Sequence, residues 1–483
     1  MSKRNYPFHW KWLWQLLLLV GVIGRSSVAL AQASRDTASF TLSNAKLQNL
    51  GVATVAQPRR LVLLNVTHPG HDQTLVEQYW RDEHLRPRRQ AHFTLRGKLE
   101  LASAQGTAHY LLVQLLSRDS LVLVTVDTLG RVVAQARQAL AVRRGLFGAS
   151  DIGLEKADAF ITIEQQRENT CRLVCRSANL AVRWEKTFGP VPSATLTTSA
   201  ADSTHLWVIL MADYDKRHPL STAVCLDLAT GRELARVALT NEQARRVPTV
   251  AEMGPGHSLL VAGHAFEGEA AILRRTGDLF FQRLGPDGQV LTDQLTDFEK
   301  EPELHGAAAE RVQWQLLWPL ARGGVQLVGE TYTSTSMGGG ILKGSLTMGL
   351  AGQTVLHPKD VVSVQLTASG QVEQLRIVPL PLDKGDFSYP YYREGRIMAR
   401  MAMEAGAFRT RGLADDSTML VLRSPQQVQT LDLRSGQLHA VRPAPDKGLA
   451  DVLYIGEDFI IIAEARLAKH TLRLLRVPLS AAR

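Results

Sequence analysis

The densest group of side chains suited to ligand binding is the segment KGDFSYPYYREG at residues 384–395. Aromatic residues make up only 6% of the chain, yet four of them stand here within six positions. Glycine and proline around them are typical of a loop, and tyrosine rings in a loop can stack on a sugar or pack on a peptide. We therefore predict a ligand-binding loop, with packing of the rings beneath the loop as the alternative. Its candidate residues are Phe387, Tyr389, Tyr391, Tyr392 and Arg393.

Two histidines, His68 and His71, stand three residues apart in THPGHDQ at 67–73. Two imidazoles at this spacing could share a metal ion, with Asp72 or Glu83 as a third ligand. The alternative is a Pro-Gly turn that carries histidines by chance, because no second close pair completes a tetrahedral set. We therefore treat His68 and His71 as weak candidates and expect no metal.

The sequence offers little that points to catalysis. It contains no Gly-x-Ser-x-Gly motif, which carries the nucleophile of α/β-hydrolases. Paired carboxylates for glycoside chemistry meet only in the folded protein, so acidic residues leave a hydrolase or lyase open. We expect no cofactor and name no catalytic residue.

These candidates lie among repeated phrases of strand, corner and strand, such as CLDLATGREL at 225–234. A corner that requires a positive φ favours glycine or asparagine, so each phrase predicts a β-hairpin. In VCRSANLAVRW, at 174–184, Asn179 stands in the place of the glycine. The corner glycines are Gly130, Gly231, Gly288, Gly370 and Gly436.

A buried strand precedes most of these hairpins, for example LVLVTV at 121–126 and LWVILM at 206–211. Three or four strands per unit, repeated six or seven times, predict an all-β protein with the β-propeller fold. A β solenoid is the alternative. The run TLRLLRVPL at 471–479 is expected to complete the first blade and close the ring, and residues 333–354 are expected to form a loop or a protruding hairpin.

The chain divides into three parts. Residues 1–31 have a positive start, a short apolar run and the small-x-small site Ala29-Leu30-Ala31, which predict a cleaved signal peptide and export to the periplasm, cell surface or medium. No transmembrane segment is expected after cleavage. Residues 32–105 are expected to form a small cap or a partial blade, with strands at 60–66 and 91–101 and a short helix at 74–85. Residues 106–483 are expected to form the repeat domain.

Charge and cysteine content bound the partners and the redox chemistry. Removal of the signal peptide lowers the formal net charge from +9 to +5, and the arginine pairs are scattered, so no nucleic-acid partner is expected. Cys171 and Cys175 would lie about 13 Å apart on a strand, too far for a disulfide. A Cys175–Cys225 bond is conceivable, but we expect free buried thiols.

Two stretches carry a resemblance at the level of the repeat. GGVQLVGETY (323–332) and DVVSVQLTASGQVEQLRIVPLP (360–381) resemble exported propeller-like repeat proteins of Gram-negative bacteria with no assigned function. The resemblance covers roughly residues 110–480 and implies the fold and export. LDLATGREL is also similar to repeats of quinone-dependent dehydrogenases, which place a tryptophan shortly after the glycine. Only Trp184 stands in such a place, so no quinone is expected.

Together these patterns predict an exported, non-enzymatic scaffold that binds a protein or polysaccharide ligand through loops on one face of the ring. The alternative is an extracytoplasmic hydrolase or lyase whose acidic residues meet at the central channel. The sequence leaves the oligomeric state open.

Overall fold

The computed structural model describes residues 37–479, apart from a set of internal gaps. The predicted signal peptide lies outside the described residues. No helix among the described residues is long and apolar enough to cross a membrane. The gaps are 42–49, 56–59, 118, 140–151, 155–157, 166–169, 190–194, 213–219, 241–244, 267–277, 298–310, 322, 337–353, 381–386, 390–398, 400–402, 404–407, 415–417, 425–426, 444–448, 457–458 and 467–470.

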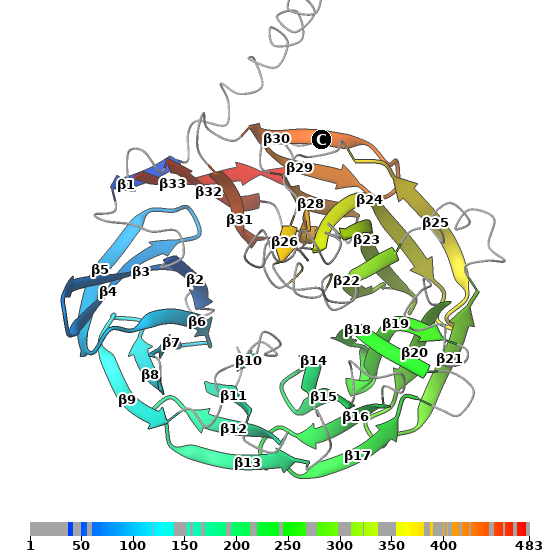
Figure 1. Cartoon of the computed structure of the whole chain (residues 1–483), viewed down its shortest axis with the longest axis horizontal. Coiled ribbons are helices and arrows are strands. Elements are labelled where there is room, and N and C mark those ends of the chain that lie inside the picture. The colour runs from blue at the N-terminus through cyan, green and yellow to red at the C-terminus, as the bar shows by residue number, and fades with distance from the viewer. Residues whose placement is uncertain are drawn as a thin grey trace, which may run out of the picture.

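The described strands form eight antiparallel sheets that surround a common centre, which defines a β-propeller (Figure 1). We number the blades 1 to 8 along the chain. Blade 1 contains β2 (Leu50–Val55), β3 (Arg60–Gly70), β4 (Gln73–Asp82) and β5 (Pro87–Arg96), and blade 2 contains β6 (Glu100–Gly106), β7 (Tyr110–Leu116), β8 (Ser120–Asp127) and β9 (Val132–Ala139). Blade 3 contains β10 (Ile152–Leu154), β11 (Ala159–Gln165), β12 (Cys171–Ser177) and β13 (Val182–Phe188). Blade 4 contains β14 (Thr195–Ala201), β15 (His205–Ala212), β16 (Leu220–Asp227) and β17 (Glu233–Ala238).

The second half of the ring repeats this order, with one additional short strand in blade 6. Blade 5 contains β18 (Arg245–Met253), β19 (Leu259–Phe266), β20 (Asp278–Leu284) and β21 (Val290–Thr296), and blade 6 contains β22 (Arg311–Pro319), β23 (Val325–Ser336), β24 (Thr354–Leu366), β25 (Val372–Val378) and β26 (Phe387–Tyr389). Blade 7 contains β27 (Thr410–Ala414), β28 (Met419–Arg423), β29 (Gln427–Asp432) and β30 (Leu438–Pro443). Blade 8 contains β31 (Leu449–Ile455), β32 (Phe459–Arg466), β33 (Thr471–Pro478) and β1 (Thr37–Thr41).

The predicted all-β propeller is confirmed, but the predicted six or seven blades are wrong, because there are eight. The corners identified in the sequence belong to blades 2 to 7. Blade 1 has no glycine at its corner, where Leu85 adopts φ 61° instead. Leu85 is only 2% exposed and packs in an apolar cluster with Leu61 and Phe459. Burial of this side chain offsets the strain of the left-handed backbone, so the corner needs no glycine and leaves no glycine signal.

The helix predicted at 74–85 is also wrong, since residues 73–82 form strand β4. Burial alternates along β4, with Val76 and Trp80 fully buried on one face. The apolar pairs at 75/79 and 76/80 are four residues apart, and this spacing fits both one face of a helix and one face of a strand. The pairing of β4 with β3 and β5 decides between the two.

The corner glycines behave as predicted. Gly130, Gly231, Gly288, Gly370 and Gly436 all have positive φ, between 70° and 86°. Each of them also lies close to side chains of the preceding blade. A Cβ added at Gly231 would lie 2.6 Å from the ring of Trp184 in the preceding blade, and the indole N–H of Trp184 donates a hydrogen bond to the carbonyl of Leu228 at 2.9 Å.

Asn179 is not the residue that replaces glycine in blade 3. The left-handed residue there is Leu180, with φ 63°, and its N–H donates to the carbonyl of Ser177 at 2.8 Å. Like Leu85, Leu180 is buried, and it packs with Leu121 of blade 2. Asn179 instead accepts a hydrogen bond from the N–H of Ala181 through its side chain, which stabilises the turn without a positive φ.

The ring closes by pairing of the two ends of the described chain. β1 is the fourth strand of blade 8 and pairs antiparallel with β33 from Thr37↔Leu475 to Thr41↔Thr471. The C-terminal run therefore stays in the last blade, and the N-terminal strand completes that blade. The prediction that residues 471–479 complete the first blade is therefore wrong, because β33 pairs with β32 and β1 within blade 8.

The cores lie between neighbouring blades. One cluster joins Trp184 and Phe188 of blade 3 to Leu206 and Val208 of blade 4, as expected for sheets that must bury both faces. The three cysteines are free and buried, which confirms the expectation. Burial raises the pKa values of the Cys171, Cys175 and Cys225 thiols to about 12, 11 and 12, so these thiols are protonated at neutral pH.

The two faces of the ring carry different connections. Because successive strands are antiparallel, the first-to-second and third-to-fourth connections of each blade lie at one end of the strands. Those at 107–109, 202–204, 254–258 and 285–289 are short, and we call their side the tight-turn face. The opposite side holds longer connections, among them 140–151, 267–277 and 337–353, and we call it the long-connection face.

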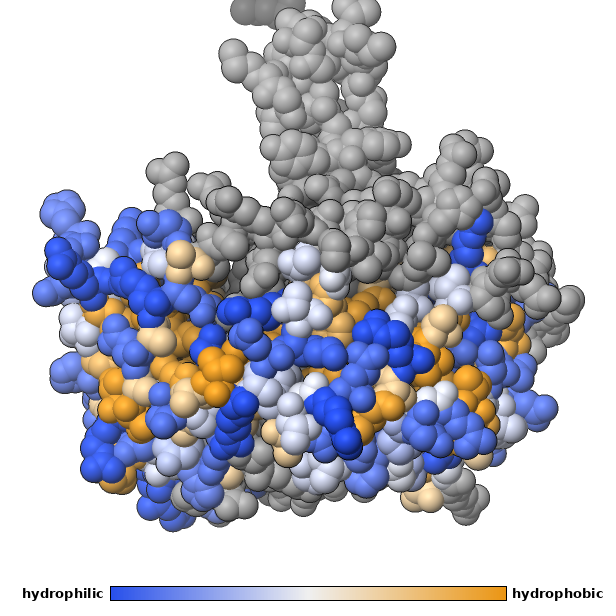
Figure 2. Space-filling model, turned by 90° about the horizontal axis from the view of Figure 1, so that it is seen from below, coloured by the Kyte–Doolittle hydropathy of each residue, from blue (hydrophilic) through white to orange (hydrophobic). Residues whose placement is uncertain are grey.

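The outer wall of the ring mixes hydrophobic and hydrophilic residues (Figure 2). Val132, Val182 and Val290 follow three of the corners on the outermost strands and are 44–50% exposed. They are interspersed with charged residues, and single exposed aliphatic residues of this kind are normal on a solvent-facing surface.

Candidate functional site

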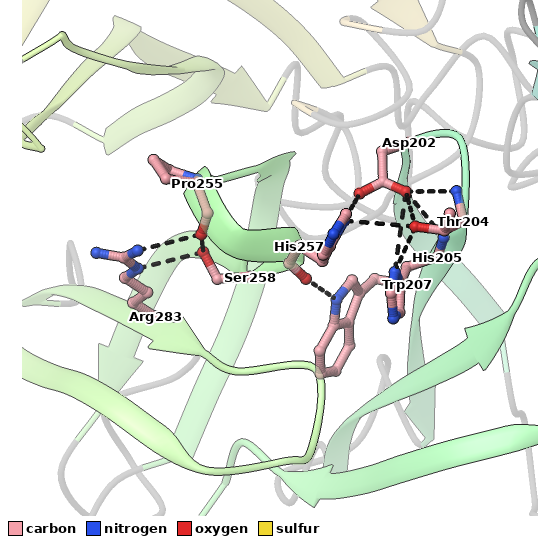
Figure 3. A network of polar contacts seen from close by, with 8 residues as sticks. All are labelled: Asp202, Thr204, His205, Trp207, Pro255, His257, Ser258 and Arg283. Atoms are coloured by element: carbon pink, nitrogen blue, oxygen red, sulfur yellow. Dashed lines mark hydrogen bonds and ion pairs between the residues drawn. The ribbon is translucent and has the colours of Figure 1, made fainter.

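Four polar side chains from two blades meet on the tight-turn face (Figure 3). Asp202 and Thr204 lie in the turn between β14 and β15 of blade 4, and His205 begins β15. His257 ends the 3-10 turn η4 (Pro255–His257) between β18 and β19 of blade 5. We call these residues, Asp202, Thr204, His205 and His257, the rim cluster.

The contacts within the rim cluster are short. Nδ1 of His257 lies 2.6 Å from Oδ2 of Asp202. The Thr204 hydroxyl oxygen lies 2.8 Å from Nδ1 of His205 and 3.4 Å from Nδ1 of His257. The two imidazole rings are stacked, with centroids 4.6 Å apart and an interplanar angle of 30°. All four side chains therefore converge on one small volume.

Asp202 is held as an anion. Its Oδ1 accepts hydrogen bonds from the backbone N–H groups of Thr204, at 2.7 Å, and His205, at 2.8 Å, and from the Thr204 hydroxyl at 3.0 Å. Partial burial raises the pKa of the carboxyl, but the hydrogen bonds from His257, Thr204 and His205 outweigh it and lower the pKa to about 2. Oδ1 is thus occupied by the turn of blade 4, while Oδ2 faces blade 5.

The turn that presents His257 is strained and well supported. Gly256 has φ 69° and His257 has φ 61°, a left-handed conformation that side chains other than glycine adopt at a cost. The indole N–H of Trp207 donates to the carbonyl of His257 at 3.2 Å. Nε of Arg283 donates to the Ser258 hydroxyl at 3.2 Å on the other side of the turn. These contacts hold the imidazole over Asp202.

The cluster has the composition of a metal centre. One ligand atom each from Asp202, His205 and His257 can be chosen so that all three lie within 4.8 Å of one another. Within the part of the chain that the structure describes, this is the one such group of three histidine, cysteine or acidic residues. Imidazole nitrogen with carboxylate oxygen suits Zn²⁺ and other divalent transition-metal ions.

A related contact joins blades 2 and 3 at the same rim. Nδ1 of His109, in the turn before β7, lies 2.7 Å from Oδ2 of Asp158, in the turn before β11. The Thr107 hydroxyl donates to Oδ1 of Asp158 at 2.9 Å. Partial burial raises the pKa of Asp158, while the hydrogen bonds from His109 and Thr107 lower it to a value below the ordinary one. We call this group, Thr107, His109 and Asp158, the rim pair.

The weak metal candidates lie apart from both groups. His68 is near the end of β3, and its Nε2 lies 2.9 Å from the carbonyl oxygen of Leu99. His71 is exposed in the turn between β3 and β4. Asp72, the proposed third ligand, accepts a hydrogen bond from Nε of Arg96 at 3.1 Å.

The aromatic candidates fall at the edge of what the structure describes. Phe387 and Tyr389 are the ends of β26, whose backbone pairs with β24 from Leu356↔Phe387 to Thr354↔Tyr389. Tyr391, Tyr392 and Arg393 lie outside the described residues. Ligand binding by this segment stays a prediction.

Two fully or nearly buried carboxylates join blades instead of facing the channel. Glu330 of β23 is 0% exposed, and its oxygens accept hydrogen bonds from the N–H groups of Arg409, at 2.9 Å, and Thr410, at 2.7 Å. Glu464 of β32 is 3% exposed and accepts from Nε of Arg442 at 2.7 Å. Both contacts cross from one blade to the next, which gives these acids a structural role.

The rim cluster was not among the sites expected from the sequence, although the sequence carries a signal for it. Asp202 and His205 directly precede the buried strand LWVILM, and His257 directly precedes SLLVAG. In a ring of repeats, residues at equivalent positions before the second strand of each blade lie side by side at one rim. Aligning the chain on these buried strands, rather than on the corner glycines, brings the cluster together.

Fold and site together define the class of protein: an eight-bladed β-propeller with an Asp-His-His group between two blades. No family model matches the sequence, and no curated protein matches it.

Solved structures to which the chain is similar are distant. They include a prolyl endopeptidase, at 12% identity and TM-score 0.41, with 92% of this chain and 57% of that chain covered. Dipeptidyl peptidase 4 of Porphyromonas gingivalis is similar at 10% identity and TM-score 0.44, with 91% and 60% covered. The WD40 domain of coronin from Toxoplasma gondii has 8% identity and TM-score 0.32, with 62% and 71% covered. Likenesses this low carry no argument about activity, and the fold rests on the strand topology.

Proposed function

We propose that this chain is an exported, non-enzymatic β-propeller scaffold that binds a protein or glycan ligand on its long-connection face. The observation that carries the proposal is the unequal share of chain between the two faces. Connections such as 140–151, 267–277 and 337–353 join strands on one side, whereas the other side is made of short turns closed by their own hydrogen bonds. Recognition residues of a rigid β scaffold are concentrated in its longer loops.

The position of β26 supports this choice of face. The pairing of β23 with β24 extends to Ser336↔Thr354, beyond the pairing of β24 with β25, which runs from Val361 to Leu366. β26 pairs with the additional length of β24. Figure 1 shows β26 on the inner side of the ring, beside the start of β24. β26, which runs from Phe387 to Tyr389, therefore lies at the long-connection end of blade 6.

Several aspartates have a structural role in the corners between the third and fourth strands. Those with the clearest partners are ionised and engaged in turns: Asp127 accepts from the N–H of Leu129 and from Nε of Arg131, and hydrogen bonds and the charge of Arg131 outweigh partial burial and lower its pKa. Asp227 and Asp432 cap the corners of blades 4 and 7 in the same way, with lowered pKa values. A general acid needs a raised pKa instead.

One observation favours the enzymatic alternative. Glu252 lies on β18, the innermost strand of blade 5, and burial raises the pKa of its carboxyl. A raised carboxyl pKa is the direction that a general acid requires, which would suit a hydrolase or lyase. Glu252 is the residue that a test of this alternative must change.

The test is a glycan and peptide array probed with the mature chain and with three variants. We expect binding by the wild type, loss of binding in Tyr391→Ala/Tyr392→Ala with an unchanged melting temperature, and retention in Trp318→Ala. Trp318 is the matched aromatic control, because it is 43% exposed and stands next to a turn of the tight-turn face. Binding lost in Trp318→Ala but kept in the tyrosine variant would refute the choice of face. Turnover of a bound glycan that disappears in Glu252→Gln would establish the enzyme instead.

A further inference from the structure

The rim cluster contains more potential metal ligands than a contact between two blades requires. The rim pair joins blades 2 and 3 with a single imidazole on a single carboxylate. The rim cluster has the same imidazole–carboxylate contact, Asp202 with His257, and adds His205 stacked on His257. A second histidine with its Nδ1 in the same volume is unexplained by blade docking.

We propose that Asp202, His205 and His257 bind a divalent transition-metal ion of the Zn²⁺ type and so link blades 4 and 5 at the tight-turn face. The ion would take one carboxylate oxygen and one nitrogen from each imidazole. Three protein ligands leave a fourth position for water, and the exposed side of His257, at 49%, faces solvent. The site is independent of the ligand face proposed above.

The distances are those of a ligand set that needs only side-chain rotation to close on an ion. Oδ2 of Asp202, the oxygen that the turn leaves available, is 2.6 Å from Nδ1 of His257. Ligand atoms about 2.0–2.2 Å from a tetrahedral Zn²⁺ are separated by roughly 3.3–3.6 Å. Side-chain rotation that lengthens the Oδ2–Nδ1 distance and turns His205 away from the Thr204 hydroxyl would bring the three ligand atoms towards this value.

The surroundings orient the ligands as the outer partners of a metal centre do. The N–H groups of Thr204 and His205 and the Thr204 hydroxyl hold Oδ1 of Asp202 and leave Oδ2 directed at His257. Such partners fix ring and carboxylate orientation and raise affinity.

The backbone at His257 is a second and independent observation. His257 adopts φ 61° directly after Gly256 at φ 69°. Left-handed residues other than glycine are strained, and they cluster at functional positions such as ligand-binding sites. Unlike Leu85 and Leu180, His257 gains no apolar burial in return, since its side chain is half exposed. Asp158 of the rim pair is likewise left-handed, at φ 43°, so this backbone marks residues placed for a polar contact at the rim.

The experiment uses the untagged full chain, treated with chelator and then titrated calorimetrically with Zn²⁺ at neutral pH. Co²⁺ is added separately as a spectroscopic probe of nitrogen and oxygen coordination. We expect one Zn²⁺ per chain, a visible Co²⁺ absorption band and a higher melting temperature with Zn²⁺, because an ion that binds only the folded state stabilises it.

The variants assign the site. His205→Asn, His257→Asn and Asp202→Asn should each weaken Zn²⁺ binding by more than about 100-fold, since loss of an outer partner alone costs ~10–100-fold. Thr204→Val, which removes such a partner, should fall in that smaller range. Asparagine tolerates a positive φ, so His257→Asn keeps the turn, and its metal-free melting temperature checks the fold.

His109→Asn is the matched control from the rim pair, and His68→Ala/His71→Ala controls for the hairpin histidines. Both should bind Zn²⁺ as the wild type does. The proposal is overturned if the wild type gives no zinc heat and no Co²⁺ band, or if His205→Asn and His257→Asn still bind. It is equally overturned if binding is lost only in the His68/His71 variant. A melting temperature of the wild type that changes with pH but not with Zn²⁺ would also overturn it.

Discussion

The junctions between blades 2 and 3 and between blades 4 and 5 use the same rim position in different ways. In both, a histidine of one blade meets an aspartate of the next, with a threonine hydroxyl on the carboxylate. The order is reversed, since His109 precedes Asp158 whereas Asp202 precedes His257. Only the second junction adds another imidazole. The comparison shows that the turn between the first and second strands of a blade is where neighbouring blades make polar contacts. One additional histidine at that turn changes a contact between two blades into a group of three potential metal ligands.

The outer ends of the two junctions also differ. Blade 3 docks on blade 2 through Leu180, a buried side chain on a left-handed backbone. Blade 5 docks on blade 4 through Gly288, whose missing Cβ leaves room for Ala235. The corner at Leu180 gains apolar burial but has a strained backbone. The corner at Gly288 has no such strain, and its backbone approaches the preceding blade closely.

Leu180→Ala should destabilise the fold by about 2–4 kcal/mol, because it empties an apolar site at the blade 2–blade 3 junction. Leu180→Gly should be more stable than Leu180→Ala by roughly 1 kcal/mol, since glycine relieves the left-handed strain that alanine keeps. Urea unfolding of the three proteins measures both differences. An alanine variant more stable than the glycine variant would show that the backbone at this corner is not strained.

Gly288→Val should cost about 1–3 kcal/mol, because a β-branched residue is strained at φ 86° and its Cβ would lie 3.1 Å from the Cβ of Ala235. Gly256→Ala is the matched control, since no atom lies within 4 Å of an added Cβ at φ 69°, and it should cost only the backbone strain of about 1 kcal/mol. Equal losses in the two variants would argue that Gly288 makes no close contact.

Asp202 should make stability depend on acid pH. Its folded pKa of about 2 lies below the unfolded value of 3.8, so its contribution is complete above about pH 4 and is lost as the pH falls towards 2. A quarter of the side chain is exposed, and solvent screening reduces the expected contribution to about 1 kcal/mol. Asp202→Asn should flatten the stability profile between pH 4 and pH 2, measured by urea unfolding in metal-free buffer. A profile as steep as that of the wild type would contradict this role.

His109→Asn should have the smallest effect, below about 0.5 kcal/mol at neutral pH, because the ring is half exposed and loses one contact with a carboxylate. Thermal unfolding with and without Zn²⁺ measures it. A loss larger than that of Gly256→Ala would mean that the rim pair has a greater part in holding blades 2 and 3 together than its exposure implies.

Several features of the fold follow from local sequence alone. The strand–corner–strand phrases predict the hairpins, and positive φ at Gly130, Gly231, Gly288, Gly370 and Gly436 follows from the chemistry of a tight corner. The buried thiols follow from their place on apolar strands. These inferences succeed because a corner and the burial pattern of a strand are settled by a few neighbouring residues.

The blade count, the closure of the ring and the rim cluster were decided by tertiary structure. Blade 1 was expected only as a cap or a partial blade, because burial of Leu85 against blade 8 replaces the glycine signal at its corner. Closure depends on pairing Thr37–Thr41 with β33, residues far apart in sequence whose local patterns do not name each other. Asp202, His205 and His257 meet only because adjacent blades bring equivalent turns to one rim. Contacts between residues more than fifty positions apart are set by the packing of whole blades, and the sequence indicates them only when the repeats are aligned on the second strand of each blade.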